Sequence, residues 1–334
     1  MLSTIGQTPL IRLTHVLPNM HFQLFAKLET FNPGGSIKDR TAVNIIYDAL
    51  ERGQIQPGGT IIESSSGNLG IGLAQACAYM GLHFICIVDP RTNVQNMDIM
   101  RVYGATVDLI TEPHPITGDF LQARIERAQY LAETIPNSFW CNQYANLANP
   151  HAHHQTMHEI ATNLHGKVDY LFCATSTCGT LRGCAEYIRR YELDTTVIAV
   201  DAVGSVIFGG KPGPRLLPGH GAGRRPEHYQ DDLADEYIHV SDLECVVGCR
   251  RLVRHEAILA GASSGGIITA LDRLKDTIKP NANCVLILCD RGERYLNTVY
   301  SDIWVDAHFG NVWHLWEENK ITSSHDPIVE NIHM

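Results

Sequence analysis

One lysine in a glycine-rich segment is well suited to covalent chemistry. The segment reads Asn32-Pro33-Gly34-Gly35-Ser36-Ile37-Lys38-Asp39-Arg40. Its Pro-Gly-Gly portion predicts a turn, Ser36 is the expected N-cap, and the apolar spacing from Ile37 to Leu50 predicts a helix. Lys38 would then lie where a loop enters a rigid helix, although a lysine in a first helical turn can also be merely solvated. An amine that attacks an aldehyde must be unprotonated, and burial lowers a lysine pKa in that direction.

A second polar segment follows, Glu63-Ser64-Ser65-Ser66-Gly67-Asn68-Leu69-Gly70. Its small residues, hydroxyls and amide are suited to holding a carboxylate. Together, a lysine that forms a Schiff base and a loop that holds an amino-acid carboxylate indicate pyridoxal 5′-phosphate (PLP) chemistry.

Two further loops each open a predicted helix. Thr175-Ser176-Thr177-Cys178-Gly179-Thr180 follows the strand-like run Tyr170–Cys173. Backbone N–H groups at a helix N-terminus bind anions, so this loop is a candidate phosphate site, or else an ordinary connection with a threonine cap. In the loop Gly261-Ala262-Ser263-Ser264-Gly265-Gly266, a serine hydroxyl can face a pyridine nitrogen, or serve only as an N-cap.

Composition narrows the class. The 334 residues favour two domains, and 44% hydrophobic with 19% charged residues is typical of a globular enzyme. A net charge of −10 argues against nucleic-acid binding. We expect no membrane span and no secretion signal, and hence a cytoplasmic protein. The ten cysteines stand mostly in apolar runs without a Cys-x-x-Cys pair, so we expect buried free thiols.

Strand-like and helix-like runs alternate along the chain, which predicts an α/β fold with parallel-rich sheets. The long segment 202–226, rich in glycine, proline and arginine, is expected to be functional. We expect the polar tail after about Asp306 to be a partly ordered extension. Strands are expected at 24–28, 84–88, 107–110, 170–173, 197–200 and 284–288, and helices at 67–80, 116–134, 178–190, 241–257 and 264–276.

These motifs resemble fold-type II PLP enzymes of the cysteine synthase and cystathionine β-synthase group. The resemblance spans roughly residues 1–305, from Ile5-Gly6-Gln7-Thr8-Pro9-Leu10 to Gly292-Glu293-Arg294-Tyr295-Leu296. It implies a tryptophan synthase β-like fold with PLP in the cleft between two α/β domains. The large domain is expected at 1–34 and 147–310, a small mobile domain at 35–146 and a C-terminal tail at 311–334.

The resemblance also implies roles for particular residues. Lys38 would be the Schiff-base lysine and Asn68 would lie beside the 3′-oxygen of PLP. Ser65, Ser66 and Gln143 would help to hold the substrate carboxylate. The phosphate would be bound by Ser176, Thr177, Cys178, Gly179 and Thr180, and Ser263 would face the pyridine nitrogen.

Departures from the family pattern point to a narrower branch. The phosphate loop is Ser176-Thr177-Cys178-Gly179-Thr180 rather than Gly-Thr-Gly-Gly-Thr, Tyr144 replaces phenylalanine, and Arg291 replaces a small residue. The chain is similar to a siderophore-pathway branch that joins the amine of L-glutamate to O-phospho-L-serine on the way to 2,3-diaminopropionate. That resemblance implies a homodimer, a partner NAD-dependent dehydrogenase, and Tyr144, Ser176 and Arg124 as contacts of the second substrate.

Alternatives stay open at this point. A cysteine synthase that uses O-acetylserine and sulfide is the main rival, and a non-catalytic protein of the same fold is another. Arg124 can instead be a surface arginine paired with Glu126 or Glu133, and Arg291 can bind an anion or form a structural ion pair. Cys178 is expected to be a small packing residue. His151, His154 and His158 share helical spacing, but we expect a helix start at a domain or subunit boundary there and no metal.

Overall fold

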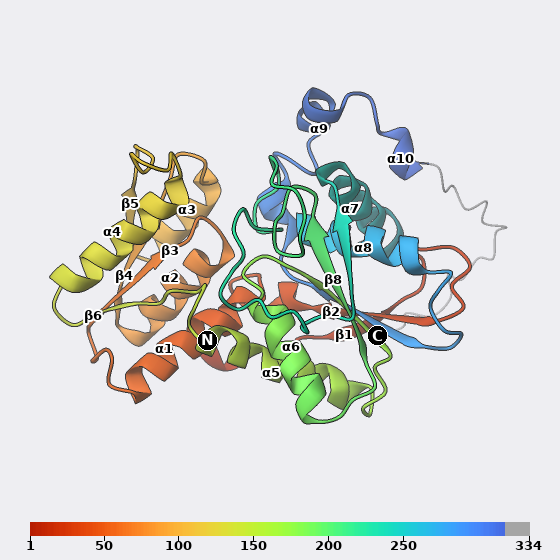
Figure 1. Ribbon diagram of the computed structural model, residues 1–334, viewed down its shortest axis with the longest axis horizontal. Coiled ribbons are helices and arrows are strands. Elements are labelled where there is room, and N and C mark those ends of the chain that lie inside the picture. The colour runs from red at the N-terminus through yellow and green to blue at the C-terminus, as the bar shows by residue number, and fades with distance from the viewer. Residues whose placement is uncertain (318–334) are drawn as a thin grey trace, which may run out of the picture.

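The computed structural model describes residues 1–317, which fold around two separate sheets (Figure 1). The strands of these residues are β1 (Leu10–Leu13), β2 (Gln23–Leu28), β3 (Thr60–Ser64), β4 (His83–Val88), β5 (Thr106–Leu109), β6 (Ser138–Trp140), β7 (Tyr170–Ala174), β8 (Thr196–Ala202), β9 (Glu236–Val240) and β10 (Asn283–Leu288). The α-helices are α1 (Lys38–Glu51), α2 (Asn68–Met80), α3 (Val94–Val102), α4 (Phe120–Thr134), α5 (Ala148–Asn163), α6 (Gly179–Arg190), α7 (Asp242–Glu256), α8 (Ala262–Leu274), α9 (Asp302–Phe309) and α10 (His314–Glu317). Short 3₁₀ helices are η1 (Leu2–Thr4), η2 (Glu29–Phe31) and η3 (Gly292–Tyr295).

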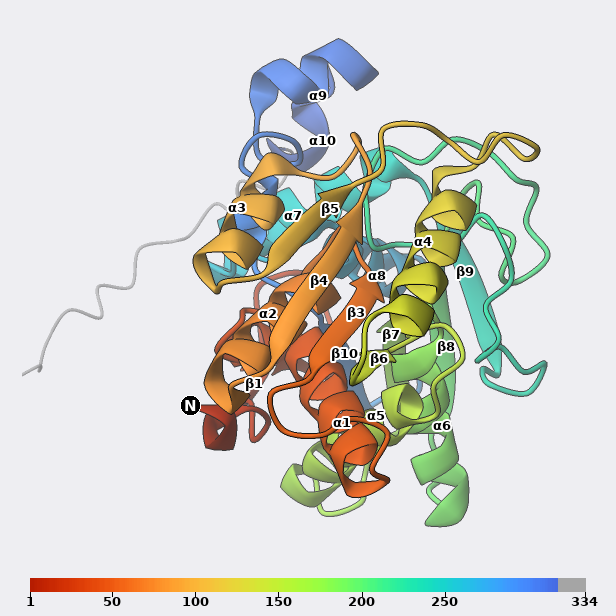
Figure 2. The ribbon, with the colours of Figure 1, turned by 90° about the vertical axis from the view of Figure 1, so that its left-hand side faces the viewer.

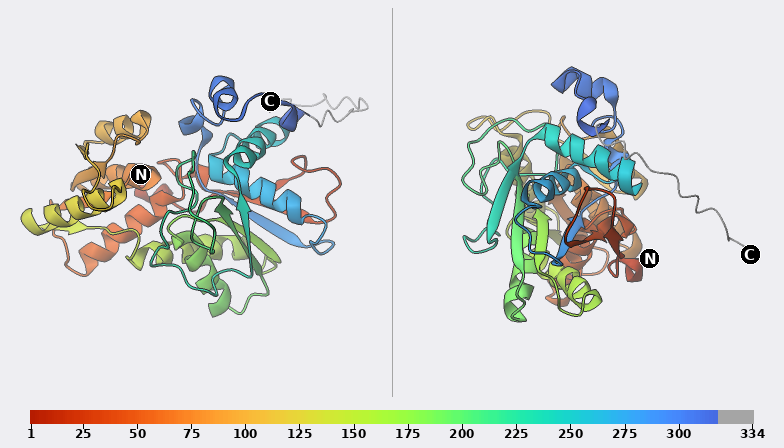
Figure 3. Two further views of the ribbon diagram at one scale, coloured as in Figure 1. Left: turned by 45° about the horizontal axis from the view of Figure 1, so that its top comes forward. Right: turned by 90° about the vertical axis from the view of Figure 1, so that its right-hand side faces the viewer.

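The larger sheet has the strand order β1-β2-β10-β7-β8-β9. Only β1 runs antiparallel to its neighbour, and the other pairs are parallel. Successive strand residues point to opposite faces. Leu286 therefore packs with α7 and α8 on one face, whereas Val285 and Ile287 pack with α5 and α6 on the other. The right-hand view of Figure 3 shows this three-layer arrangement.

The smaller sheet has the order β5-β4-β3-β6 and is parallel throughout (Figure 2). Neighbouring residues of β3 again face opposite layers. Ile61 packs with α1 and α2, and Ile62 packs with α4. The predicted α/β architecture with parallel-rich sheets is confirmed.

Helix boundaries follow capping groups, and some differ from the predicted ones. The helix predicted from 116 begins at Phe120 because the Asp119 carboxylate accepts the N–H groups of Leu121 and Gln122. The helix predicted from 264 begins two residues earlier, at Ala262. The prediction of Ser36 as N-cap of α1 is wrong: Ile37 holds that position, and the Ser36 hydroxyl accepts the N–H of Lys38 at 3.2 Å.

A glycine lets α2 lie against the beginning of α1. A Cβ added at Gly72 would lie 3.2 Å from the carbonyl oxygen of Lys38 and 3.1 Å from Cβ of Ala42. These distances leave little room for a side chain, so the small residue sets how closely the two helices approach. Helix α2 therefore packs directly on the first turn of α1, which carries Lys38.

The last described residues pack on the larger lobe, which is the part of the molecule built around the larger sheet. Val312 and Trp316 contact the core beside α7, and the guanidinium of Arg250 lies 4.9 Å from the Trp316 ring centroid. The rest of the predicted tail, 318–334, lies outside the described residues. Through residue 317, the structure has no helix long and apolar enough to cross a membrane.

Candidate active site

One cavity is lined by every residue to which the family resemblance gave a role in cofactor or substrate binding. Both sheets contribute to it, because the lining loops follow the carboxyl ends of β3, β6, β7 and β10, where parallel sheets usually bind ligands. The predicted residues that line it are Lys38, Ser65, Ser66, Asn68, Arg124, Gln143, Tyr144, Ser176, Thr177, Cys178, Gly179, Thr180 and Ser263. Residues from segments far apart in the chain therefore form a single site.

Lys38 is the first residue of α1 and lines this cavity. Burial lowers the pKa of its amine, while the nearby thiols of Cys289, Cys173 and Cys178 act in the opposite direction. A lowered pKa increases the fraction of neutral amine, which is the form that attacks an aldehyde or accepts a proton. The local environment therefore favours Lys38 as a nucleophile and base.

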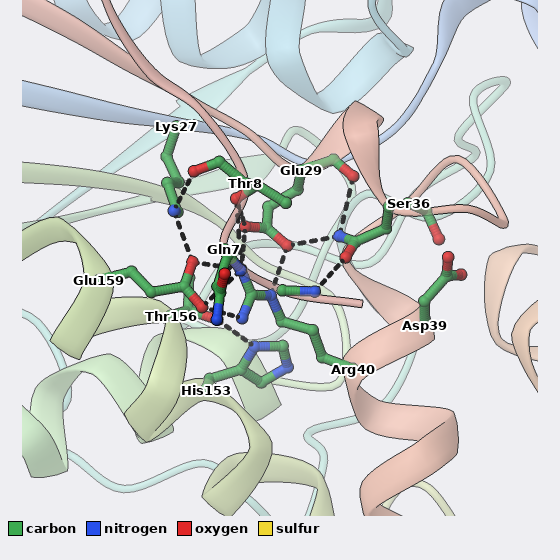
Figure 4. A network of polar contacts seen from close by, with 12 residues as sticks. Gln7, Thr8, Lys27, Glu29, Ser36, Asp39, Arg40, His153, Thr156 and Glu159 are labelled. Carbon is green, nitrogen blue, oxygen red and sulfur yellow. Dashed lines mark hydrogen bonds and ion pairs between the residues drawn. The ribbon is translucent and has the colours of Figure 1, made fainter. Parts of the chain in front are cut away.

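A buried ionic network anchors α1 two residues beyond Lys38 (Figure 4). The Arg40 guanidinium donates to Glu29 Oε2 at 2.7 Å and to Glu159 Oε1 at 2.7 Å. The Lys27 ammonium donates to Glu159 Oε2 and to the carbonyl of Thr8, both at 2.6 Å. The network joins β2, η2, α1 and α5, so it fixes the start of α1 relative to the larger sheet.

Removing the charge of Glu159 should destabilise the fold. Burial alone would raise the pKa of this carboxyl, but hydrogen bonds and charge from Arg40, followed by Lys27, bring it to about 2. We expect Glu159→Gln to lower the free energy of unfolding by about 3 kcal/mol at pH 7, since it leaves two buried cations short of a partner. Denaturant unfolding measures this, and Asp98→Asn, which removes an exposed ion pair with Arg101, is the matched control with an expected change below about 1 kcal/mol.

The difference in the free energy of unfolding between wild type and Glu159→Gln should depend on pH. Because the folded pKa of Glu159 lies below the ordinary value of 4.5, its stabilisation is complete above pH 4.5 and is lost as pH falls toward 2. The difference between wild type and Glu159→Gln should shrink over that interval. A difference that is small at pH 7, or constant down to pH 2, would contradict the role of the network.

The candidate phosphate loop ends in an unusual backbone conformation. Cys178 is the N-cap residue of α6 and has φ of 63°, a region that favours glycine. The helix N–H groups that follow lack partners inside the helix and are available to an anion. Cys178 packs in the core, as predicted, and burial raises the pKa of its thiol to about 12, so it is not a reactive thiolate.

The Asn68 amide bridges the two halves of the site. Its Nδ2 donates to Asp290 Oδ2 at 2.8 Å, and its Oδ1 accepts from Arg294. Asp290, which follows β10, also accepts from the Tyr295 hydroxyl at 2.8 Å. Sequence reasoning missed Asp290 and Tyr295 as cavity residues, although both stand next to or within the Gly292–Leu296 motif and Asp290 follows a predicted strand end.

Ser65 and Ser66, in the loop after β3, and Gln143 form the cavity wall on the side of the smaller sheet. Ser65 Oγ accepts the N–H of Gly70 at 3.0 Å, which supports the first turn of α2. Gln143 Nε2 donates to the carbonyl of Ser64 at 3.3 Å, and its backbone N–H donates to the Glu63 carboxyl. Burial raises the pKa of Glu63 to about 8 against these hydrogen bonds and the charge of Arg124.

Arg124 is buried at this wall, with 8% of its surface exposed. The alternative of a surface arginine paired with Glu126 or Glu133 is therefore wrong. Its Nε lies 3.4 Å from Asp89 Oδ2, yet among the described residues Nε and Nη1 have no hydrogen-bond acceptor. A guanidinium has five N–H donors, and a buried one short of acceptors is suited to an anionic ligand.

Two other candidates lie away from the cavity. Arg291 is exposed and does not line this cavity, and its Nε donates to the carbonyl of Thr30 at 2.7 Å. Among the described residues it takes part in no ion pair. Two of the α5 histidines contact α6: His154 lies 3.0 Å from the Glu186 carboxylate and His158 lies 3.0 Å from the Tyr187 hydroxyl.

The residues of the cavity fit PLP. A lysine with a lowered pKa, a helix N-terminus for a phosphate and the buried hydroxyl of Ser263 line the same space. An aldehyde, a phosphate and a pyridine nitrogen are the groups that these three features would hold.

Comparison with known proteins assigns the class. The family model described as pyridoxal-phosphate dependent enzyme matches residues 1–290, and the chain belongs to this family. A solved structure of O-ureido-L-serine synthase superposes with a TM-score of 0.84 at 30% identity, covering 94% of this chain and 97% of that one. O-acetylserine dependent cystathionine β-synthase from Helicobacter pylori gives a TM-score of 0.83 at 30% identity, covering 90% of this chain and 98% of that one. The fold is thus that of the fold-type II PLP enzymes.

A more similar relative is known by sequence. The N-(2-amino-2-carboxyethyl)-L-glutamate synthase of Ralstonia nicotianae (strain ATCC BAA-1114 / GMI1000) is 47% identical over 302 residues, which cover 90% of this chain and 89% of that protein. The family, the fold and this relative identify the chain as a PLP-dependent β-replacement enzyme of the cysteine synthase group.

Proposed function

We propose that this enzyme joins the amine of L-glutamate to Cβ of O-phospho-L-serine. The products are N-(2-amino-2-carboxyethyl)-L-glutamate and phosphate. The name of the Ralstonia relative supports this product, and the departures at Tyr144, Ser176 and Cys178 support a nucleophile other than sulfide.

The burial of Arg124 is the observation that carries the proposal. Sulfide needs no cation to orient it, whereas glutamate brings two carboxylates. Arg124 lines the cavity that also contains Lys38, with two guanidinium nitrogens short of acceptors. Tyr144 and Ser176 line the same cavity and add hydroxyl groups. Charge-assisted hydrogen bonds from an arginine are suited to a carboxylate. This wall of the cavity therefore favours an amine that carries carboxylates as the second substrate.

The reaction divides into two stages around Lys38. PLP, when bound, supplies an aldehyde for the amino group of Lys38 or of the substrate and a ring that withdraws electrons from Cα. In the first stage Ser65, Ser66 and Gln143 hold the carboxylate of O-phospho-L-serine, the amine of Lys38 takes the Cα proton, and the Cβ–O bond breaks to release phosphate. In the second stage the glutamate nitrogen bonds to Cβ and loses a proton, and Lys38 returns a proton to Cα.

Further features of the proposal concern the assembly and its setting. We propose a cytoplasmic homodimer whose small domain, 35–146, moves against the large domain, 1–34 with 147–310, as substrate binds. The product would pass to an NAD-dependent dehydrogenase that releases 2,3-diaminopropionate for siderophore assembly. The Asn68–Asp290 contact, which joins the start of α2 to the end of β10, lies where such a movement would open or close the site.

Changes at Tyr144 and Ser176 should affect the second stage selectively. Tyr144→Phe and Ser176→Gly each remove a hydroxyl proposed to contact glutamate, so we expect kcat/KM for glutamate to fall about tenfold or more. Phosphate release from O-phospho-L-serine alone, measured in a single turnover, should change less than threefold. Equal losses in the two stages would contradict the proposed contacts.

A further inference from the structure

A second arginine, Arg224, lies over the ring of Tyr144. Arg224 is an exposed residue of the long segment that joins β8 to β9, traced in Figure 1. The Cζ atom of Arg224 lies 5.6 Å from the centroid of the Tyr144 ring. Through residue 317, the Arg224 guanidinium takes part in no ion pair, so its charge is available to a ligand.

Tyr144 lies within reach of both cations. Burial raises the pKa of its phenol, and the charges of Arg124 and Arg224 each act against this rise. Arg124 belongs to α4, beside the smaller sheet, whereas Arg224 belongs to a segment attached to the larger sheet. One arginine is buried and the other is exposed, so the pair extends from the inner wall toward solvent.

The chemistry of glutamate matches this arrangement. The reacting amine and the α-carboxylate are both bonded to Cα, so both must lie inside the cavity when the nitrogen reaches the acceptor carbon near Lys38. The γ-carboxylate is two methylene groups farther away and extends toward the opening. The α-carboxylate inside the cavity would therefore lie at the depth of Arg124, and the γ-carboxylate near the opening would lie at the depth of Arg224.

We propose that Arg224 binds the γ-carboxylate of the glutamate nucleophile and so selects a dicarboxylic amino acid. This inference rests on the proposed function and extends it to a residue outside the cavity lining. Arg224 belongs to the glycine- and proline-rich segment 202–226, so the inference also gives that segment a role in choosing the second substrate.

A matched pair of variants tests the inference in the full-length holoenzyme. Arg225 is the next residue, is also exposed, and its Cζ atom lies 4.5 Å from the ring centroid of Tyr229, which is not a residue of the cavity lining. Arg224→Gln and Arg225→Gln therefore remove the same charge from the same segment. With saturating O-phospho-L-serine, we expect Arg224→Gln to raise KM for glutamate about tenfold with little change in kcat, and Arg225→Gln to leave both values within twofold.

The preference between two nucleophiles gives the second readout. L-2-Aminobutyrate has the same amine and α-carboxylate as glutamate but lacks the γ-carboxylate. The preference for glutamate should fall about tenfold in Arg224→Gln and persist in Arg225→Gln. Equal effects of the two variants, or an unchanged preference in Arg224→Gln, would overturn the inference alone. A wild-type enzyme that releases phosphate but never consumes glutamate would overturn the inference together with the proposed function.

Discussion

Lys38→Ala is expected to reduce turnover by at least about 10³-fold without unfolding the protein. The variant loses both the amine that binds the cofactor aldehyde and the base that moves the Cα proton, and general acid–base catalysis alone contributes about 10²–10⁴-fold. Phosphate release from O-phospho-L-serine should fall as far as overall turnover, because Lys38 acts in the first stage. Single-turnover phosphate release and steady-state product formation measure the two quantities.

The control for this loss is an exposed lysine. Lys279→Ala removes a solvent-exposed lysine after α8 and should leave both rates within twofold. The thermal unfolding of Lys38→Ala should match wild type within a few degrees, because Lys38 is not a member of the Arg40–Glu29–Glu159–Lys27 network. A Lys38→Ala enzyme that still releases phosphate at a tenth of the wild-type rate would exclude Lys38 as the catalytic base.

Arg124→Met is expected to separate the two stages of the reaction most clearly. Truncating a buried charged group that binds an anion costs about 2–5 kcal/mol, which corresponds to a loss of roughly 10²-fold or more in kcat/KM for glutamate. Phosphate release from O-phospho-L-serine should stay within about threefold of wild type. Stopped-flow phosphate detection with and without glutamate follows both stages in one experiment.

Arg127→Met is the matched control on the same helix. Arg127 lies one turn from Arg124, but its side chain is 39% exposed and pairs with Asp108 rather than lining the cavity. We expect this variant to retain both stages and to lose little stability, since exposed ion pairs contribute about 1 kcal/mol or less. If Arg124→Met slows phosphate release as strongly as glutamate use, Arg124 serves the site as a whole and the argument for a dicarboxylate nucleophile fails.

Much of the fold can be predicted from local patterns of apolar and polar residues. The buried strands of both sheets are short apolar runs between glycine or polar segments, and each of the six strands expected from them is present. The loop after the predicted strand 170–173 was expected to bind a phosphate because ligands bind at the carboxyl ends of parallel strands, and Ser176 and Thr180 do line the cavity. The prediction that this loop shares a site with the loop after β3 came from the family resemblance, because β3 and β7 belong to different sheets.

The rest depends on partners that are distant in sequence. Glu159 meets Lys27 across 132 positions and Arg40 across 119, and nothing in the local sequence marks either pair as buried. Arg124 has charged neighbours along α4 that resemble a solvated face, and only the packing of α4 on the smaller sheet buries it. Asp290 was missed because its contact with Asn68, 222 positions away, joins two separate parts of the fold, and its nearby partner Tyr295 alone does not mark a site.

Product identification tests the central claim most directly. The purified holoenzyme is given O-phospho-L-serine or O-acetyl-L-serine, each with L-glutamate or with sulfide, and the products are identified by mass spectrometry. We expect O-phospho-L-serine and glutamate to give N-(2-amino-2-carboxyethyl)-L-glutamate with one equivalent of phosphate. Cysteine formed from O-acetyl-L-serine and sulfide, with glutamate unused under every condition, would contradict the account and identify a cysteine synthase.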